Sequence, residues 1–191
     1  VWSLDLGGSE LMSSRAHGSE RALATLACAP VAARSRPRVL VGGLGFGYTL
    51  RAALDALPAS AEVVVCELFD LVIEANRGEA GALAGRPLDD PRTLLVQSDV
   101  HDALASGPFD AILLDVDNGP GFLIHDHNAR VYAPDWLAMA VERLNPGGVL
   151  AVWSDAPAPG LHRTLARLGA VDEQLIRVNR QGRGFDYALY R

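Results

Sequence analysis

The sequence predicts an α/β fold: a doubly wound, mostly parallel seven-stranded sheet with a small N-terminal β-hairpin and an antiparallel C-terminal strand. Three observations support this prediction. Apolar runs such as residues 62–68 and 109–115 are continuous rather than alternating, as in strands that helices cover on both faces. Helical patterns alternate with these runs along the chain. A glycine-rich turn joins the first run of this kind to its helix.

The N-terminal segment is expected to form a hairpin and a helix. Residues 1–13 alternate between apolar and polar on both sides of Gly7 and Gly8, which indicates a hairpin. Residues 18–28 have a helical pattern, and Ser19 is the expected N-cap.

The regular alternation of strands and helices begins at residue 38. Strands are expected at residues 38–43, 62–68, 92–99, 109–115 and 147–154, and helices at residues 48–57, 70–78, 100–106, 134–144 and 159–169. Residues 81–91 are expected to be mostly loop, and residues 170–191 to form two strands joined by a turn. We therefore divide the chain into residues 1–30, the N-terminal hairpin and helix, and residues 31–191, one α/β domain.

Composition and charge argue against several classes of protein. The 191 residues carry a net charge of −6, which argues against a nucleic-acid partner because phosphates favour a basic face. No apolar run approaches the roughly 18 residues of a membrane span and no signal peptide is visible, so we expect no membrane partner and a cytoplasmic location. Cys28 and Cys66 lie far apart in apolar runs and are expected to be buried, without a disulfide or a metal.

The turn after residues 38–42 carries the strongest functional signal. Gly43, Gly45 and Gly47 alternate with other residues just before a helix begins. Glycine lets the backbone turn tightly and approach a ligand, and a helix N-terminus offers free N–H groups. A dinucleotide-binding turn needs a small residue where Tyr48 stands. This counts against a nicotinamide-dependent oxidoreductase, which stays as the lesser alternative.

Acidic residues end the next two strands. Glu67 lies where an acid accepts hydrogen bonds from ribose hydroxyls in nucleotide-binding folds, and Asp99 is placed to accept one from an adenine amino group. Each could instead be a solvated loop carboxylate or a helix N-cap. Three successive strand ends thus offer contacts to one ligand: the glycines offer backbone contacts, Glu67 a ribose contact and Asp99 a base contact. We therefore predict an adenosine-type ligand.

These motifs resemble those of a known family. The stretches GGLGFGYTLRAAL, FDAILLDVDNGP and RLNPGGVLAVWS, with Glu67 and Asp99 in the same order, resemble the spermidine synthase family of polyamine aminopropyltransferases. GSERALATLA is similar to the family's N-terminal helix, and the resemblance spans residues 4–155. It implies the Rossmann-like fold of class I S-adenosylmethionine-dependent methyltransferases. It also implies that the three glycines, Glu67 and Asp99 bind S-adenosylmethionine or its decarboxylated form as co-substrate, and that the protein is a homodimer.

The chain departs from the family's pattern on the acceptor side of the site. Phe46 stands where the family has an aspartate that holds the ammonium of the aminopropyl arm, and Gly18 where a tyrosine is expected. In the DSSD-like stretch Asp115 is retained. The second acid, expected to help deprotonate the attacking amine, is Asn118, which cannot accept that proton. Asp117 could take over as the base, so Asp115, Asp117 and Asn118 are the catalytic candidates.

A metal site is the less favoured interpretation of the loop that follows. His125 and His127 stand two residues apart, with Asp126 between them. Asp115, Asp117 and Asn118 could complete an oxygen-rich metal site with them, of the kind that some catechol methyltransferases use. An exposed polar loop explains the same residues. We therefore expect no metal.

Two functional hypotheses from different classes follow. The first is a transferase that moves an aminopropyl or methyl group from the sulfonium donor to a small acceptor such as an amine. The resemblance favours aminopropyl transfer, whereas Phe46 and Asn118 favour methyl transfer or an unusual acceptor. The second is a non-catalytic nucleoside-binding module of the same fold.

Overall fold

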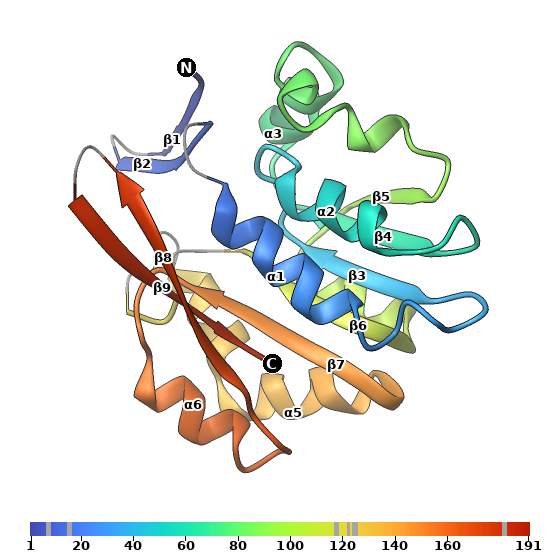
Figure 1. The fold of residues 1–191 in the computed structure, drawn as a ribbon, viewed down its shortest axis with the longest axis vertical. Coiled ribbons are helices and arrows are strands. Elements are labelled where there is room, and N and C mark those ends of the chain that lie inside the picture. The colour runs from blue at the N-terminus through green and yellow to red at the C-terminus, as the bar shows by residue number, and fades with distance from the viewer. Residues whose placement is uncertain (7–8, 15–16, 117–118, 122, 124–125, 181–182) are drawn as a thin grey trace.

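A computed structural model shows a central mixed sheet between two layers of helices (Figure 1). It describes residues 1–6, 9–14, 17–116, 119–121, 123, 126–180 and 183–191. The sheet has seven strands in the order β5-β4-β3-β6-β7-β9-β8. The strands are β3 (Arg38–Gly42), β4 (Glu62–Glu67), β5 (Thr93–Gln97), β6 (Phe109–Leu114), β7 (Leu144–Ser154), β8 (Glu173–Arg180) and β9 (Arg183–Tyr190).

The strand pairing confirms the predicted sheet. Strands β3 to β7 pair in parallel, and β9 runs antiparallel to both β7 and β8. All six residues of β6 and the last five of β4 are buried, as the continuous apolar runs predict for strands inside a covered sheet. Strand β5 lies at an edge of the sheet and is only partly buried.

Helices cover both faces of the sheet. Neighbouring residues of a strand point to opposite faces, so Val39 and Val41 join one apolar cluster while Leu40 joins the other. The first cluster includes residues of α1 (Gly18–Cys28), α2 (Tyr48–Ala56) and α3 (Asp70–Arg77). The second includes residues of α4 (Val100–Ala103), α5 (Pro134–Glu142) and α6 (Pro159–Leu165).

Two local predictions were wrong. His17, not Ser19, precedes α1 as its N-cap residue. Ser19 lies inside the first turn, where its hydroxyl donates to Glu20 Oε2 at 2.5 Å and is therefore not a cap. Residues 81–91, expected to be mostly loop, largely lie in two short 3-10 helices, η1 (Ala80–Ala84) and η2 (Pro87–Asp89). Two further 3-10 helices are η3 (Leu104–Ser106) and η4 (Asp126–Tyr132).

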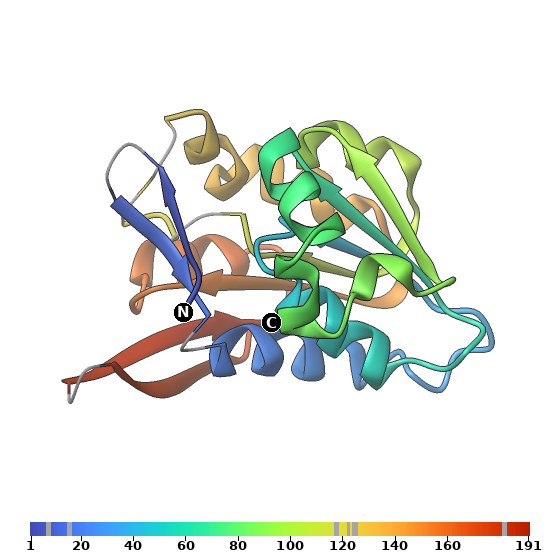
Figure 2. The same ribbon diagram turned by 90° about the horizontal axis from the view of Figure 1, so that it is seen from above.

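The predicted N-terminal hairpin is present. Strands β1 (Ser3–Leu6) and β2 (Ser9–Ser13) pair antiparallel, and the two glycines between them lie outside the described residues. In both views the hairpin lies at the same end of the molecule as the β8–β9 hairpin (Figure 2). Helix α1 follows and buries Leu23 and Ala27 in the first cluster. The boundary between residues 30 and 31 stays a prediction.

Both cysteines are buried and free, as predicted. Burial raises the pKa of the Cys28 thiol and of the Cys66 thiol to about 12, so neither is a reactive thiolate at neutral pH. Within the described ranges, no helix combines the length and the apolarity that crossing a bilayer requires.

A charged clamp fixes the end of α2. The Arg92 guanidinium donates to both carboxylate oxygens of Asp90, at 2.9 and 2.8 Å. Its Nη1 also donates to the carbonyl oxygens of Leu54 and Leu57, at 2.8 and 3.1 Å. Arg92 therefore satisfies carbonyls that the end of a helix leaves without partners.

This clamp predicts a pH-dependent stability. The hydrogen bonds from Arg92 lower the pKa of Asp90 from 3.8 to about 2. Because the folded pKa is depressed, Asp90 stabilises the fold above about pH 4 and loses this effect as the pH falls toward 2. We expect Asp90→Asn to lower the free energy of unfolding by about 1–3 kcal/mol at pH 7. Urea unfolding followed by circular dichroism measures the loss.

The exposed neighbour Asp89 provides the matched control, since Asp89→Asn should leave stability nearly unchanged. The difference between Asp90→Asn and the wild type should shrink as the pH is lowered through the range from 3.8 to 2. A difference that stays constant over this range would contradict the assigned role.

Candidate functional site

The candidate site lies at the carboxyl edge of the sheet, where the chain reverses its direction of strand addition. From β3 the chain adds β4 and β5 on one side and then returns to add β6 and β7 on the other. Ligands of open α/β sheets bind at such a switch point, outside the carboxyl ends of the strands. The three predicted glycines, Glu67 and Asp115 follow or end β3, β4 and β6 at this edge.

The glycine turn needs glycine at specific positions. Gly43, Gly45 and Gly47 have φ values of 90°, 50° and 80°, a region that residues with a Cβ rarely adopt. A Cβ at Gly43 would overlap the carbonyl oxygen of Asp115, and a Cβ at Gly47 would lie 2.8 Å from the Pro87 side chain. The turn therefore packs directly against the end of β6.

Glu67 is bound to the glycine turn. Its Oε2 accepts a hydrogen bond from the backbone N–H of Leu44 at 3.0 Å, and its Oε1 accepts one from the N–H of Phe69 at 2.9 Å. An ionised carboxylate has about four acceptor positions, so these two bonds leave capacity for two hydroxyl donors. The predicted acid of the ribose site is thus beside the turn, with 8% of its surface exposed.

Asn76 supports the same turn and was missed by the sequence interpretation. Its Nδ2 donates to the carbonyl oxygens of Gly45 at 2.7 Å and Val72 at 2.9 Å. Asn76 is buried and lies one helical turn after Val72 and Ile73 on α3. A polar residue at helical spacing from two apolar ones is the signal that could have identified it.

Asp99 is a helix N-cap, which was the structural alternative for this residue. Its Oδ1 accepts from the N–H of His101 at 2.8 Å, at the start of α4. Its Oδ2 pairs with the Arg130 guanidinium of η4 at 2.5 Å. The contact of Asp99 with an adenine stays a prediction, and Arg130 would have to share the carboxylate. No local sequence signal connects Arg130 to a strand end so far away in the chain.

Asp115 follows β6 directly. Because β3 lies between β4 and β6, Asp115 and Glu67 lie on opposite sides of the glycine turn. Its N–H donates to the carbonyl oxygen of Gly42 at 2.9 Å, and its Oδ2 accepts from the Thr49 hydroxyl at 2.5 Å. Burial and the charge of Glu20 raise the pKa of the Asp115 carboxyl to about 7. An acid with this pKa can take or give a proton near neutral pH.

Glu20 was also missed by the sequence interpretation. It lies in the first turn of α1 with only 4% of its surface exposed. It precedes the buried residues Leu23 and Ala24 by three and four positions, so it lies on the apolar face of the helix. A charged residue in that position was the available signal.

Aromatic rings pack together around the start of α2. Phe46 is buried in a small cluster with Tyr48, Ala80 and Ala84. The ring of Tyr48 stacks on His17 with 4.2 Å between the centroids. Phe46, which replaces the aspartate expected from the family resemblance, thus contributes to local packing.

The remaining predicted site residues cannot be placed. Asp117, Asn118 and His125 lie outside the described residues, and the side chains of Asp126 and His127 are not described either. Among the side chains that are described, no group of three or more His, Cys, Asp and Glu residues could hold a metal ion.

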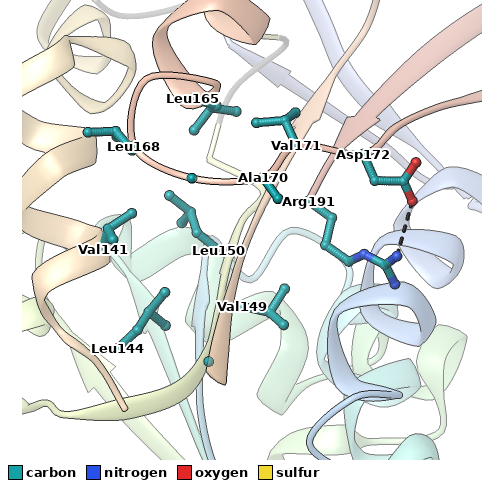
Figure 3. Close-up of a pocket in the computed structure, with 12 residues that line it drawn as sticks. Val141, Leu144, Val149, Leu150, Leu165, Leu168, Ala170, Val171, Asp172 and Arg191 are labelled. Atoms are coloured by element: carbon teal, nitrogen blue, oxygen red, sulfur yellow. Dashed lines mark hydrogen bonds and ion pairs between the residues drawn. The ribbon is translucent and has the colours of Figure 1, made fainter. Parts of the chain in front are cut away.

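A separate hollow lies far from these residues (Figure 3). It has a volume of about 530 Å³ and lies beside the first half of β7, at the amino edge of the parallel strands. Aliphatic side chains such as Leu150, Leu165 and Leu168 line it, and the ion pair of Asp172 with Arg191, at 3.1 Å, lies at its side. None of the described predicted site residues contributes to it.

The close approach at Gly43 can be tested by mutation. Gly43→Ala forces a Cβ toward the Asp115 carbonyl and places alanine at a positive φ. We expect a loss of about 1–3 kcal/mol in the free energy of unfolding. Gly160→Ala is the matched control, because a Cβ there has nothing within 4 Å. Equal stabilities of the two variants in urea unfolding would show that the turn is not packed against β6.

Comparisons with known proteins were made for the sequence and for the fold. No protein-family model matches the chain. Polyamine aminopropyltransferases of Mycobacterium tuberculosis and Mycobacterium bovis are 30% identical to it over 124 residues, which is 62% of this chain. The match covers 23% of those proteins, so the chain spans less than a quarter of the length of the curated relatives it matches.

Solved structures of two kinds share the fold. Spermidine synthase from Thermotoga maritima matches with a TM-score of 0.74 at 21% identity, covering 97% of this chain and 63% of that one. The O-methyltransferase TomG from Streptomyces achromogenes, solved with S-adenosylmethionine, matches with a TM-score of 0.62 at 21% identity, covering 97% of this chain and 82% of that one. The chain therefore has the spermidine synthase-like form of the S-adenosylmethionine-dependent methyltransferase fold that its motifs predict.

Proposed function

We propose that this chain is a spermidine synthase-like transferase that binds S-adenosylmethionine or its decarboxylated form and moves an alkyl group to a small acceptor. The observation that supports this most is the junction of Glu67 with the glycine turn. The turn supplies backbone atoms without Cβ obstruction at Gly43 and Gly45, and Glu67 retains acceptor capacity beside them. A ribose that hydrogen-bonds Glu67 would lie at the switch point of the sheet.

In this proposal, the binding sites of the sulfonium donor and of the small acceptor lie on opposite sides of the glycine turn. Glu67 and, in this proposal, Asp99 face the nucleoside, while Asp115 and Thr49 face the reacting end. Positive charge on the donor sulfur makes the carbons bonded to it electrophilic. The protein then has to hold a nucleophile in line with one of these carbons and to accept its proton.

Which alkyl group moves depends on the acceptor side. Phe46 packs with Tyr48 and two alanines and has no carboxylate to hold the ammonium of an aminopropyl arm. This packing favours the second candidate, transfer of a methyl group to a small acceptor. Solved O-methyltransferases that share the fold support this candidate. The homodimer, the cytoplasmic location and the acceptor itself stay predictions.

The ribose role of Glu67 can be tested by binding. Glu67→Gln keeps the side-chain size but removes the charge from the acceptor of two hydrogen bonds, so we expect the thioether product S-adenosylhomocysteine to bind about 10- to 100-fold more weakly. Isothermal titration calorimetry measures the affinity. Glu62→Gln, at the exposed opposite end of the same strand, is the control and should bind as the wild type does. Unchanged affinity in Glu67→Gln would remove Glu67 from the site.

A turnover assay distinguishes methyl transfer, aminopropyl transfer and the non-catalytic binding module. Purified protein is incubated with S-adenosylmethionine or its decarboxylated form and a panel of amines and hydroxyl compounds, and products are followed by mass spectrometry. Because Phe46 lacks the expected carboxylate, we expect methylated products to exceed aminopropylated ones. Aminopropylation of a diamine would assign polyamine synthesis instead. Nucleoside binding without any product would support the binding module, and absence of binding would refute the proposal.

A further inference from the structure

A buried amide from α3 holds the peptide at the centre of the glycine turn. Leu44 and Gly47 close a four-residue turn, in which the N–H of Gly47 donates to the carbonyl oxygen of Leu44 at 2.7 Å. The carbonyl group of Gly45 belongs to the central peptide of this turn, and the orientation of that peptide distinguishes one turn type from another. Asn76 Nδ2 donates to this carbonyl oxygen at 2.7 Å. A side chain from another element therefore sets the direction of the central peptide.

The amide of Asn76 lies against two of the three glycines. Both partners of its Nδ2, in Gly45 and Val72, are carbonyl oxygens, which only an N–H group can bond, so the orientation of the amide is fixed. Its Oδ1 then lies beside Gly47, where an added Cβ would be 3.3 Å away. Only 3% of the surface of Asn76 is exposed, so water cannot readily replace these contacts.

Asn76 is itself held in place by the elements around it. An added Cβ at Gly81 of η1 would overlap the backbone carbonyl of Asn76, so η1 packs directly on this residue. Val72 and Ile73, one helical turn earlier on α3, are buried in the first apolar cluster. The amide thus transmits a position that the packing of α3 and η1 has already fixed.

The helix does not need an amide at this position for its own stability. Asparagine is a poorer helix former than leucine or alanine. Within the described residues, Oδ1 of Asn76 is buried without a hydrogen-bond partner, which costs free energy. An apolar side chain would fill the same place without that cost. What it could not supply is the hydrogen bond to Gly45.

We propose that Asn76 is a positioning residue that acts through Gly45 and holds the glycine turn in the conformation that binds the nucleoside. Three glycines within five residues leave a free backbone many conformations. A ligand that had to order this turn would bind more weakly, because the lost conformational freedom opposes binding. The effect on the turn is a property of the folded chain, whereas the effect on the ligand rests on the proposed function.

Amide hydrogen exchange tests the effect on the turn without any ligand. In Asn76→Ala the bond to Gly45 is lost, and we expect the N–H of Gly47, which closes the turn, to exchange about 3- to 10-fold faster. Asn76→Ser separates the two bonds of Asn76. A serine hydroxyl in a helix can donate to the carbonyl four residues earlier, here Val72, but lacks the amide that reaches Gly45. It should therefore behave as Asn76→Ala does.

Two controls separate this effect from a general loss of stability. The amide of Leu113, in the buried centre of β6, reports global unfolding, so exchange at Gly47 is compared with exchange at Leu113 in each variant. Ile73→Val removes one methyl group from the buried face of the same helix. It should leave the ratio of the two exchange rates as in the wild type. A ratio that is also unchanged in both Asn76 variants, or in Asn76→Ser alone, would overturn the proposal.

Calorimetric titration with S-adenosylhomocysteine tests the effect on the ligand. We expect Asn76→Ala and Asn76→Ser to bind it about 3- to 10-fold more weakly, and Ile73→Val to bind it as the wild type does. Faster exchange at Gly47 with unchanged affinity would overturn the role of Asn76 in binding. Failure of the wild type itself to bind the nucleoside would refute the proposed function, and the exchange rates would still decide whether Asn76 holds the turn.

Discussion

The close approach of the Gly43 backbone to the end of β6 is the constraint on which the rest of the site depends. The N–H of Gly43 donates to the carbonyl oxygen of Cys66, and the N–H of Asp115 donates to the carbonyl oxygen of Gly42. The ends of three neighbouring strands are thereby joined through one turn. Glu67 and Asp115 consequently lie on opposite sides of this turn, in positions fixed by backbone hydrogen bonds rather than by flexible side chains.

Much of the fold could be predicted because its signals are local. Strands buried on both faces need continuous apolar runs, and the glycines with positive φ need a residue without a Cβ. Ser19 was mistaken for a cap because the sequence does not show that its hydroxyl donates to Glu20. The 3-10 turns of residues 81–91 were taken for loop because short helices of this type have weak sequence patterns.

The site was only partly predictable because several of its contacts join distant segments. Glu67 could be found from its place at the end of a strand, but the ion pair between Asp99 and Arg130 joins the N-cap of α4 to η4, which follows much later in the chain. Glu20 and Asn76 occupied apolar faces of helices, where a polar side chain indicates a special partner. Their partners, however, become visible only once helices and sheet are packed together.

The position of β9 has a consequence for how the chain acquires its structure during synthesis. Residues of β9 pair with β7 on one side and with β8 on the other, and Tyr190 is fully buried. A ribosome makes β7 and β8 first, so β7 keeps an unpaired edge until the last strand of the sheet has emerged. Closure of the sheet is therefore a non-local event, and the nascent protein carries an unpaired β-edge from the synthesis of β7 until β9 has been made.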